Sequence, residues 1–339
     1  MRNDTLLVVR GDEVGGLVAG QEPEIVEAVR RAYLAHSRGQ SSLPHSTFLR
    51  FPDSERNRII ALPAYLGDGF GLAGVKWISS FPENVGRGMA RASAVLVLNS
   101  SETGRPLALL ESSLISAQRT AASAALAART LVGDEAPEVV GLIGTGVINY
   151  EVARYLRVVL PSIRRLLVFD LDASRAASFA ERAGRELEGV TAETAPDAES
   201  VLRGARVVSL ATTAVRPWLA DVSACAPGSV LLNVSLRDLS PEAILECDNV
   251  VDDADHVCRA ETSVHLAEQR TGGREFIRCT LADLLEGSAP AKARPDAVSV
   301  FSPFGLGVLD LALGSLVFDL AVEKGVGIPV PSFFPDPAV

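Results

Sequence analysis

The middle of the chain alternates short apolar runs with helical patterns. The run 139–143 leads through Gly144-Thr145-Gly146 into a helical pattern over 148–160, and further apolar runs follow at 165–170, 207–210, 230–234 and 250–252. Because parallel strands need long crossovers, which are usually helices, this alternation is typical of βαβ units around a parallel sheet. The sequence therefore predicts an α/β fold with a doubly wound parallel sheet of the Rossmann type.

The glycine-rich turn after the first run has the residue types that a dinucleotide requires. Gly144 permits a tight turn, Gly146 lets the backbone approach a pyrophosphate, and the N-terminus of the next helix favours its charge. Asn149 replaces the third glycine of the usual fingerprint, so a turn that only packs a helix on a sheet is the alternative. The next strand ends in Asp170, 26 residues after Gly144, where a carboxylate accepts the ribose hydroxyls and repels a 2′-phosphate. Asp172, two residues further on, is a second candidate for this carboxylate.

We therefore predict that the chain binds NAD, with NADP as the alternative because Arg175 follows Asp170 closely. Ligands of parallel sheets bind at the carboxyl ends of strands, so the polar residues after the runs 207–210 and 230–234 should also face the cofactor. The predicted cofactor-binding residues are Gly144, Thr145, Gly146, Val147, Ile148, Asp170, Thr212, Thr213 and Ser235.

The composition argues against several other functions. With a net charge of -10 and a pI near 5.0, the chain lacks the basic surface that sequence-independent nucleic-acid binding needs. No apolar run approaches the length of a membrane span, and residues 1–10 show no signal-peptide pattern. The four cysteines are widely spaced without a CxxC pair, so neither a zinc site nor a disulfide framework is expected. We predict a cytoplasmic protein without a metal.

The regions that flank the predicted parallel sheet follow another pattern. A helical pattern over 22–38 precedes several short β-type runs, and a helix rich in small residues is expected over 112–131. A long apolar helix is expected over 306–324. Sequence order alone leaves two places for it, in the parallel-sheet domain or back against the first region.

Four segments resemble the ornithine cyclodeaminase/mu-crystallin family in order and spacing. They read LPAYLG (62–67), GVKWISSFPEN (74–84), TGRPLA (103–108) and RTAA (119–122), and the likeness extends over the glycine-rich turn and 301–310. Three further segments, 44–52, 234–240 and 301–307, resemble a narrower branch of this family. Members of that branch are dehydrogenases that release 2,3-diaminopropionate in staphyloferrin B and peptide-antibiotic biosynthesis.

The resemblance also implies a domain arrangement and an assembly. It implies a homodimer whose α+β substrate-binding and dimerisation domain comprises residues 1–130 and 305–339. An NAD-binding Rossmann domain, residues 131–304, is inserted between these two segments. The long final helix is then expected to return to the first domain.

Two cations in apolar surroundings are the strongest candidates for substrate handling. Lys76, one of only three lysines, can pair with a substrate carboxylate or transfer a proton, and burial would lower its pKa. Arg119 is the only cation between Glu111 and Ala128, and the family uses the matching arginine to hold the substrate α-carboxylate. The alternatives are a lysine that snorkels at a sheet edge and an arginine in a structural ion pair.

Four other residues complete the candidate site. Asp238 is the predicted acid/base partner of Lys76, although the Gly-Asp-x-Pro-Gly pattern of cyclodeaminases is lost here. The alternative role of Asp238 is to cap the helix expected to start near Pro241. The remaining candidates for substrate binding are His45, Arg50 and Arg237.

The resemblance implies NAD-dependent oxidative hydrolysis of N-(1-amino-1-carboxy-2-ethyl)-glutamate to 2-oxoglutarate and L-2,3-diaminopropionate. The altered aspartate pattern argues against ornithine cyclisation. The alternatives are an ornithine or lysine cyclodeaminase, an alanine or ketimine dehydrogenase, and a ligand-binding protein without turnover like the mu-crystallins. The predicted partners are a small amino-acid conjugate and a second copy of the chain, with neither nucleic acid nor membrane.

Overall fold

The computed structural model describes residues 5–335, and the chain divides into two compact units. The first unit comprises residues 1–119 and 306–339, and the second comprises residues 120–305. Helix α3 (Ser113–Val132) crosses from the first unit to the second, whereas the sequence places the boundary near the end of this helix. The second unit is therefore inserted between two separate segments of the first.

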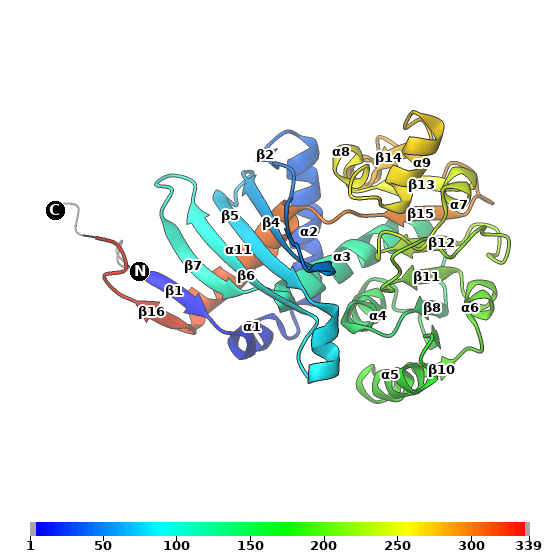
Figure 1. Ribbon diagram of the computed structural model, residues 1–339, viewed down its shortest axis with the longest axis horizontal. Helices are drawn as coiled ribbons and strands as arrows, with labels where there is room; N and C mark the ends of the chain where they lie inside the picture. Colours follow the sequence, from blue (N-terminus) through cyan, green and yellow to red (C-terminus); the bar gives the residue numbers. More distant parts are fainter. Residues whose placement is uncertain (1–4, 336–339) are drawn as a thin grey trace. The chain divides into compact units, whose positions relative to one another are not determined.

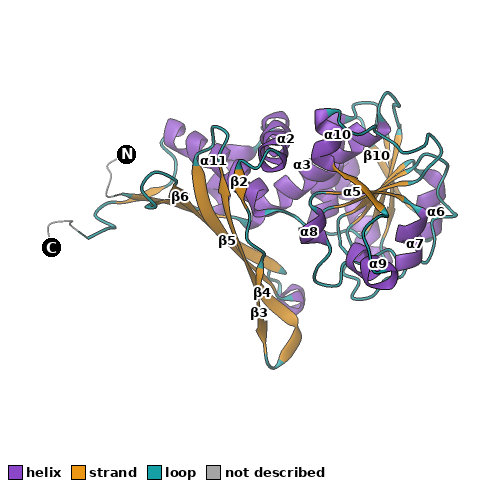
Figure 2. Ribbon diagram, turned by 90° about the horizontal axis from the view of Figure 1, so that it is seen from above, coloured by secondary structure: helices purple, strands orange, loops and turns teal. Residues whose placement is uncertain are grey.

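The first unit is built on a mixed sheet in the order β16-β1-β7-β6-β5-β4-β2, with β3 paired to β4. Neighbouring strands are antiparallel from β4 through β5 and β6 to β7, whereas β1 pairs with β7 in parallel. The β3–β4 hairpin extends away from α2 and α11 (Figure 2). The strands are β1 (Leu6–Val9), β2 (Ser41–Ser42), β3 (Thr47–Phe51), β4 (Ser54–Leu66), β5 (Leu72–Ser80), β6 (Ala92–Ser100), β7 (Pro106–Glu111) and β16 (Ile328–Val330).

Helices cover one face of this sheet. Helix α11 (Gly307–Lys324) packs against α2 (Glu22–Ser37) and against β4, β5 and β6, so that it is apolar on nearly all sides. In Figure 1 it is the orange helix behind the blue and cyan strands. Of the two places that the sequence left open for the final helix, α11 occupies the one against the first region. The other helices here are α1 (Gly11–Val18) and the short 3₁₀ helix η1 (Pro82–Arg87).

The second unit contains an all-parallel sheet in the order β10-β9-β8-β11-β12-β15-β13-β14. From β8 the chain first adds strands on one side and then on the other, which confirms the predicted doubly wound Rossmann sheet. The strands are β8 (Val139–Ile143), β9 (Arg165–Phe169), β10 (Thr191–Thr194), β11 (Val207–Leu210), β12 (Val230–Asn233), β13 (Asp248–Val251), β14 (Ile277–Thr280) and β15 (Ser299–Ser302). The helices are α4 (Val147–Val159), α5 (Ala173–Glu186), α6 (Ala198–Gly204), α7 (Pro241–Glu246), α8 (Ala254–Val257), α9 (Ser263–Thr271) and α10 (Leu281–Glu286).

Within residues 5–335, no helix has the length and apolar character that a membrane crossing needs. The same residues contain no group of His, Cys, Asp and Glu side chains arranged to hold a metal ion. All four cysteines are free thiols.

Candidate active site

A buried cluster of charged side chains lies between β5, α3 and α11. Lys76 on β5 is 2% exposed, and its Nζ lies 2.7 Å from Oδ2 of Asp310, which is fully buried in the first turn of α11. The other oxygen of Asp310 accepts a hydrogen bond of 3.0 Å from Nε of Arg119. Lys76 also donates to the hydroxyl of Ser116 at 3.1 Å. The structure thus brings together the two predicted cations and a carboxylate that they share.

Close packing of α11 on the sheet places Asp310 against Lys76. Gly314 follows Asp310 by one helical turn and therefore shares its face of α11. A Cβ atom at Gly314 would lie only 2.4 Å from Leu96, which is the register partner of Lys76 on β6. Because glycine has no side chain, the helix approaches the strands closely enough for the short carboxylate of Asp310 to reach Nζ.

Sequence reasoning missed Asp310. The available signal was an acidic residue inside the apolar helical pattern 306–324, because a carboxylate buried in such a helix requires a cationic partner. The apolar strand around Lys76 offered the complementary signal. Only the fold shows that the two residues meet.

The buried cluster contains two basic side chains and only one carboxylate. The pKa of Lys76 is lowered from 10.5 to about 8, because burial and the nearby Arg119 lower it more than Asp310 raises it. When Lys76 is protonated, two cations share one carboxylate, so one positive charge is left without a negative partner within the cluster. Buried charges are stable only when they are paired, so this site favours an anionic ligand such as a carboxylate. Near neutral pH, Lys76 also exchanges a proton easily.

The glycine-rich turn of the second unit fits a pyrophosphate. Gly144 has a φ of +91°, and a Cβ there would lie 2.5 Å from the carbonyl oxygen of Ala211, so a side chain is excluded by both conformation and space. A Cβ at Gly146 would meet nothing within 4 Å. Helix α4 begins after Gly146 without a side-chain cap, which leaves its first N–H groups available to an anion.

Asn149 explains why the fingerprint lacks its third glycine. Its side chain is fully buried and donates to the carbonyl oxygens of Ile143 and Gly144 at 2.9 and 2.7 Å. Its Oδ1 accepts a hydrogen bond of 2.7 Å from the hydroxyl of Ser209 on β11. Asn149 therefore ties the turn to two neighbouring strands, and the helix packs against the sheet through these hydrogen bonds.

Asp170 lies beside the same turn. Its Oδ2 accepts hydrogen bonds from the backbone N–H and the hydroxyl of Thr145 at 2.9 and 2.7 Å, and its Oδ1 accepts one from the N–H of Asp172. Burial alone would raise the pKa of Asp170, but these hydrogen bonds outweigh burial and lower it. The carboxylate is thus charged and held at the end of β9, where a ribose is expected. Val147 is exposed and Ile148 half-buried in the first turn of α4.

Asp238 fixes the loop that follows β11. Its Oδ1 accepts hydrogen bonds from the hydroxyl of Thr212 and from the indole N–H of Trp218, the latter at 2.6 Å. Burial raises the pKa of Asp238 despite these two bonds. The alternative role as a helix cap is wrong, because Ser240 caps α7 through the N–H of Ala243. A role of Asp238 as acid or base stays a prediction.

The remaining candidates come from elements other than the β5, α3 and α11 that carry the charged cluster. Arg50, on β3, is exposed, with its guanidinium 5.7 Å from the centre of the Phe48 ring. His45 is exposed and precedes β3. Arg237, in the second unit, donates to backbone carbonyl oxygens of residues 260 and 261, so its guanidinium already holds a loop. Thr213 is exposed after β11, and Ser235 donates to a backbone carbonyl of that strand.

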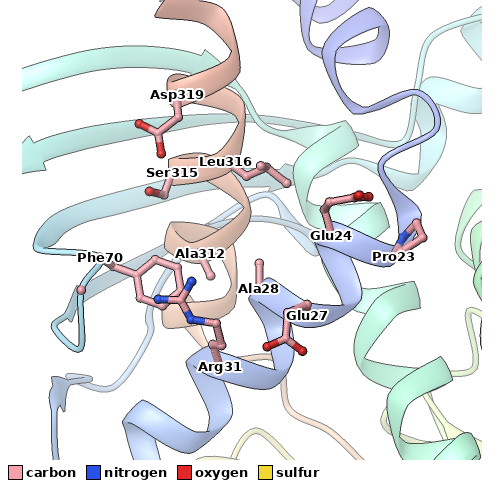
Figure 3. A pocket seen from close by; sticks show the side chains of 11 residues that line it. Pro23, Glu24, Glu27, Ala28, Arg31, Phe70, Ala312, Ser315, Leu316 and Asp319 are labelled. Carbon is pink, nitrogen blue, oxygen red and sulfur yellow. The ribbon is translucent and has the colours of Figure 1, made fainter. Parts of the chain in front are cut away.

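An open groove of about 460 Å³ lies between α2 and α11, outside the cluster (Figure 3). The guanidinium of Arg31 lies over the ring of Phe70, 4.7 Å from its centre. Asp319 and Ser315, both on α11, line the groove. None of the residues predicted for the site lines this groove.

Comparison with known proteins identifies the family. The model of the ornithine cyclodeaminase/mu-crystallin family matches residues 8–325. The chain belongs to the ornithine cyclodeaminase/mu-crystallin family. The buried cluster and the nucleotide turn of this family member both lie within the matched residues.

Several relatives in the family are dehydrogenases or reductases. The chain is 27% identical over 336 residues to N-((2S)-2-amino-2-carboxyethyl)-L-glutamate dehydrogenase of Staphylococcus aureus, covering 96% of this chain and 98% of that protein. The structure of Thermococcus litoralis Δ(1)-pyrroline-2-carboxylate reductase with NADH and L-proline has a TM-score of 0.89 and 26% identity, covering 96% and 100% of the two chains. An archaeal alanine dehydrogenase dimer with bound NAD has a TM-score of 0.86 and 26% identity, covering 97% and 100%.

Proposed function

We propose that this protein is an NAD-dependent dehydrogenase that acts on N-((2S)-2-amino-2-carboxyethyl)-L-glutamate, the compound named for the Staphylococcus aureus relative. The products are 2-oxoglutarate and 2,3-diaminopropionate. The observation that carries the proposal is the buried cluster of Lys76, Arg119 and Asp310, whose excess positive charge suits a substrate rich in carboxylates. Two structural relatives that hold NADH or NAD support the choice of cofactor.

The proposed reaction breaks the bond between the secondary amine nitrogen and the α-carbon of the glutamate moiety. The nicotinamide, when bound, accepts the hydride from that α-carbon. The amine loses one proton and becomes an imine, and water then adds to the imine carbon. Collapse of this adduct releases 2-oxoglutarate as the ketone and 2,3-diaminopropionate as the primary amine.

Different residues of the cluster bind the substrate and transfer the proton. Arg119 holds a substrate carboxylate, since a guanidinium presents two parallel donors. Neutral Lys76 accepts the proton of the substrate ammonium, for which a pKa of about 8 is suited. Gly144, Gly146 and the first N–H groups of α4 hold the pyrophosphate, and Asp170 holds the ribose.

The test applies one assay of NADH formation to several candidate substrates. Purified protein is incubated with NAD⁺ and the synthetic glutamate conjugate, and formation of NADH is followed by absorbance. We expect turnover of the conjugate and the appearance of both products. If the conjugate is inert while alanine, proline or ornithine is turned over, another activity of the family replaces the proposed one.

Asp170 should set the preference for NAD over NADP. Asp170→Asn keeps the shape and the contact with Thr145 but removes the charge that repels a 2′-phosphate. We expect the ratio of the NADPH and NADH dissociation constants, measured by calorimetry, to fall about 10-fold or more. Asp172→Asn is the matched control, because Asp172 is exposed and caps α5, a task that asparagine also performs. An equal change in both variants would contradict the assignment.

We also propose that two copies of the chain associate through the uncovered face of the first unit's sheet. On the face opposite Lys76, Tyr65, Trp77 and Val95 are 39%, 43% and 39% exposed. An apolar sheet face of this kind is typical of an interface. Trp77→Glu should convert a dimer to a monomer by light scattering, whereas Val322→Glu, an exposed apolar position on α11, should not. A Trp77→Glu protein that remains dimeric would place the interface elsewhere.

A further inference from the structure

Asp238 has one carboxylate oxygen that the described part of the chain leaves without a hydrogen bond. The side chain is fully buried, and Oδ1 accepts the hydrogen bonds from Thr212 and Trp218 described above. Oδ2 is buried as well but has no hydrogen-bond partner there. Buried polar atoms are almost always hydrogen-bonded, and a carboxylate oxygen without a donor is costly. The position of Oδ2 therefore indicates a donor supplied by a bound ligand.

The loop that carries Asp238 is anchored by backbone hydrogen bonds. The N–H groups of Trp218 and Leu219 donate to the carbonyl oxygen of Asp238 at 3.0 and 2.9 Å. Two residues earlier, Leu236 accepts a hydrogen bond of 2.7 Å from the N–H of Ser263 and has a φ of +75°. This left-handed conformation typically costs a residue other than glycine about 1–3 kcal/mol and persists where the surrounding structure enforces it. The carboxylate is therefore held in place before any ligand binds.

The order of the strands indicates which part of a dinucleotide lies near Asp238. Asp170 follows β9 on one side of β8, whereas Thr212 and Asp238 follow β11 and β12 on the other side. The close approach of the Ala211 carbonyl to Gly144 shows that the loop after β11 adjoins the glycine-rich turn. A dinucleotide lies across such a sheet with one nucleoside on each side of the switch point. When Asp170 holds the adenosine ribose, the nicotinamide half therefore extends over β11 and β12.

The groups around Oδ2 suit the nicotinamide ring and its carboxamide. A carboxamide has two N–H donors, and an ionised carboxylate only accepts hydrogen bonds. Trp218, whose indole N–H is held by Oδ1, remains 40% exposed and offers an aromatic surface on which a flat ring can pack. A ribose also has hydroxyl donors, but it presents no flat ring to the indole.

We propose that Oδ2 of Asp238 accepts a hydrogen bond from the carboxamide of bound NAD, with Trp218 packed beside the nicotinamide ring. The inference rests on the part of the proposed function that places the pyrophosphate at Gly144 and the ribose at Asp170, and it holds for any substrate. A hydrogen bond to the carboxamide fixes the rotation of the ring, and thereby which of its two faces meets the substrate. Asp238 thus binds the cofactor in addition to holding the loop after β11.

The experiment compares NAD⁺ with two analogues by calorimetry. In the 3-acetylpyridine analogue a methyl group replaces the carboxamide NH₂, and ADP-ribose lacks the ring altogether. The wild type should bind the 3-acetylpyridine analogue about 10- to 100-fold more weakly than NAD⁺, because a hydrogen bond to a charged acceptor is lost. Asp238→Asn keeps an oxygen for Thr212 and Trp218 but replaces Oδ2 by an NH₂ group, which suits the carbonyl that both ligands share. In this variant the two affinities should become nearly equal, while ADP-ribose binds as it does to the wild type.

Trp218→Phe is the matched control. It removes a hydrogen bond to Oδ1 but leaves Oδ2 and an aromatic ring, so the preference for NAD⁺ over the 3-acetylpyridine analogue should persist. Thermal melting checks that each variant is folded. Equal affinities of these two ligands in the wild type, or an unchanged preference in Asp238→Asn, would overturn the inference. Loss of the preference in Trp218→Phe would assign it to the shape of the loop and not to Oδ2.

The three ligands also separate this inference from the proposed function. If ADP-ribose does not bind, the placement of the dinucleotide is wrong and the inference falls with it. If the wild type prefers NAD⁺ and Asp238→Asn loses this preference, but the glutamate conjugate is not turned over, the inference stands and the proposed reaction falls.

Discussion

Lys76→Met is expected to abolish turnover while leaving NAD binding unchanged. Methionine fills similar space but neither accepts a proton nor pairs with Asp310, which lies 2.7 Å from the lysine nitrogen. Loss of a proton-transferring group typically lowers kcat by roughly 100- to 10,000-fold, and loss of a contact with the substrate adds to this. The measurement is NADH formation at saturating NAD⁺, together with calorimetric titration of NAD.

Lys324→Met is the matched control for this variant. Lys324 is exposed at the end of α11, far along the helix from Asp310, and its replacement should preserve turnover. Substantial turnover by a folded Lys76→Met protein would remove Lys76 from the reaction. Loss of NAD affinity in that variant would show that the lysine acts on the second unit, contrary to the proposed division of roles.

Asp310→Asn should destabilise the fold and shift the pH dependence of the reaction. Removing one partner from a buried ion pair leaves the other charges uncompensated and typically costs about 3–5 kcal/mol of unfolding free energy. Urea titration measures this loss. The kcat/KM profile should rise near pH 8, where Lys76 loses its proton and becomes able to accept one, and this rise is one limb of the profile. Because Asp310 raises the pKa of Lys76, replacing Asp310 should move this limb to lower pH.

Arg119→Gln should shift the pH dependence of kcat/KM in the direction opposite to that of Asp310→Asn. Arg119 lowers the pKa of Lys76, so its replacement should move this limb above pH 8 while KM rises because a carboxylate ligand is lost. A purely structural role of the cluster predicts lower stability without opposite shifts of the two pH profiles. Shifts in the same direction would contradict the assignment of this limb to Lys76.

The Rossmann sheet was predictable because its central strands are buried on both faces. Such strands appear in the sequence as continuous apolar runs, and the expected run 139–143 coincides with β8. Strands β10 and β14 escaped prediction because they lie at the two edges of the sheet and carry exposed or half-buried residues. The central strand β15 was not predicted either, although its four residues are all buried. The initial elements β1 and α1 were missed as well; β1 has only four residues.

The candidate site was predictable only in its individual residues. Apolar surroundings marked Lys76 and Arg119, because an isolated cation in such a segment requires an explanation. Their shared partner Asp310 lies 191 residues beyond Arg119, and only the packing of α11 reveals it.

The insertion of one unit into the other also has a consequence for biosynthesis. A ribosome releases Lys76 and Arg119 long before Asp310, with the whole second unit between them. During this interval, β5 lacks the cover of α11, and the two cations lack their carboxylate. Domains generally fold in the order of their synthesis, but here the inserted unit completes first and the first unit must wait for the last helix. Nascent chains that end before residue 306 should therefore expose an unfinished sheet to chaperones and proteases.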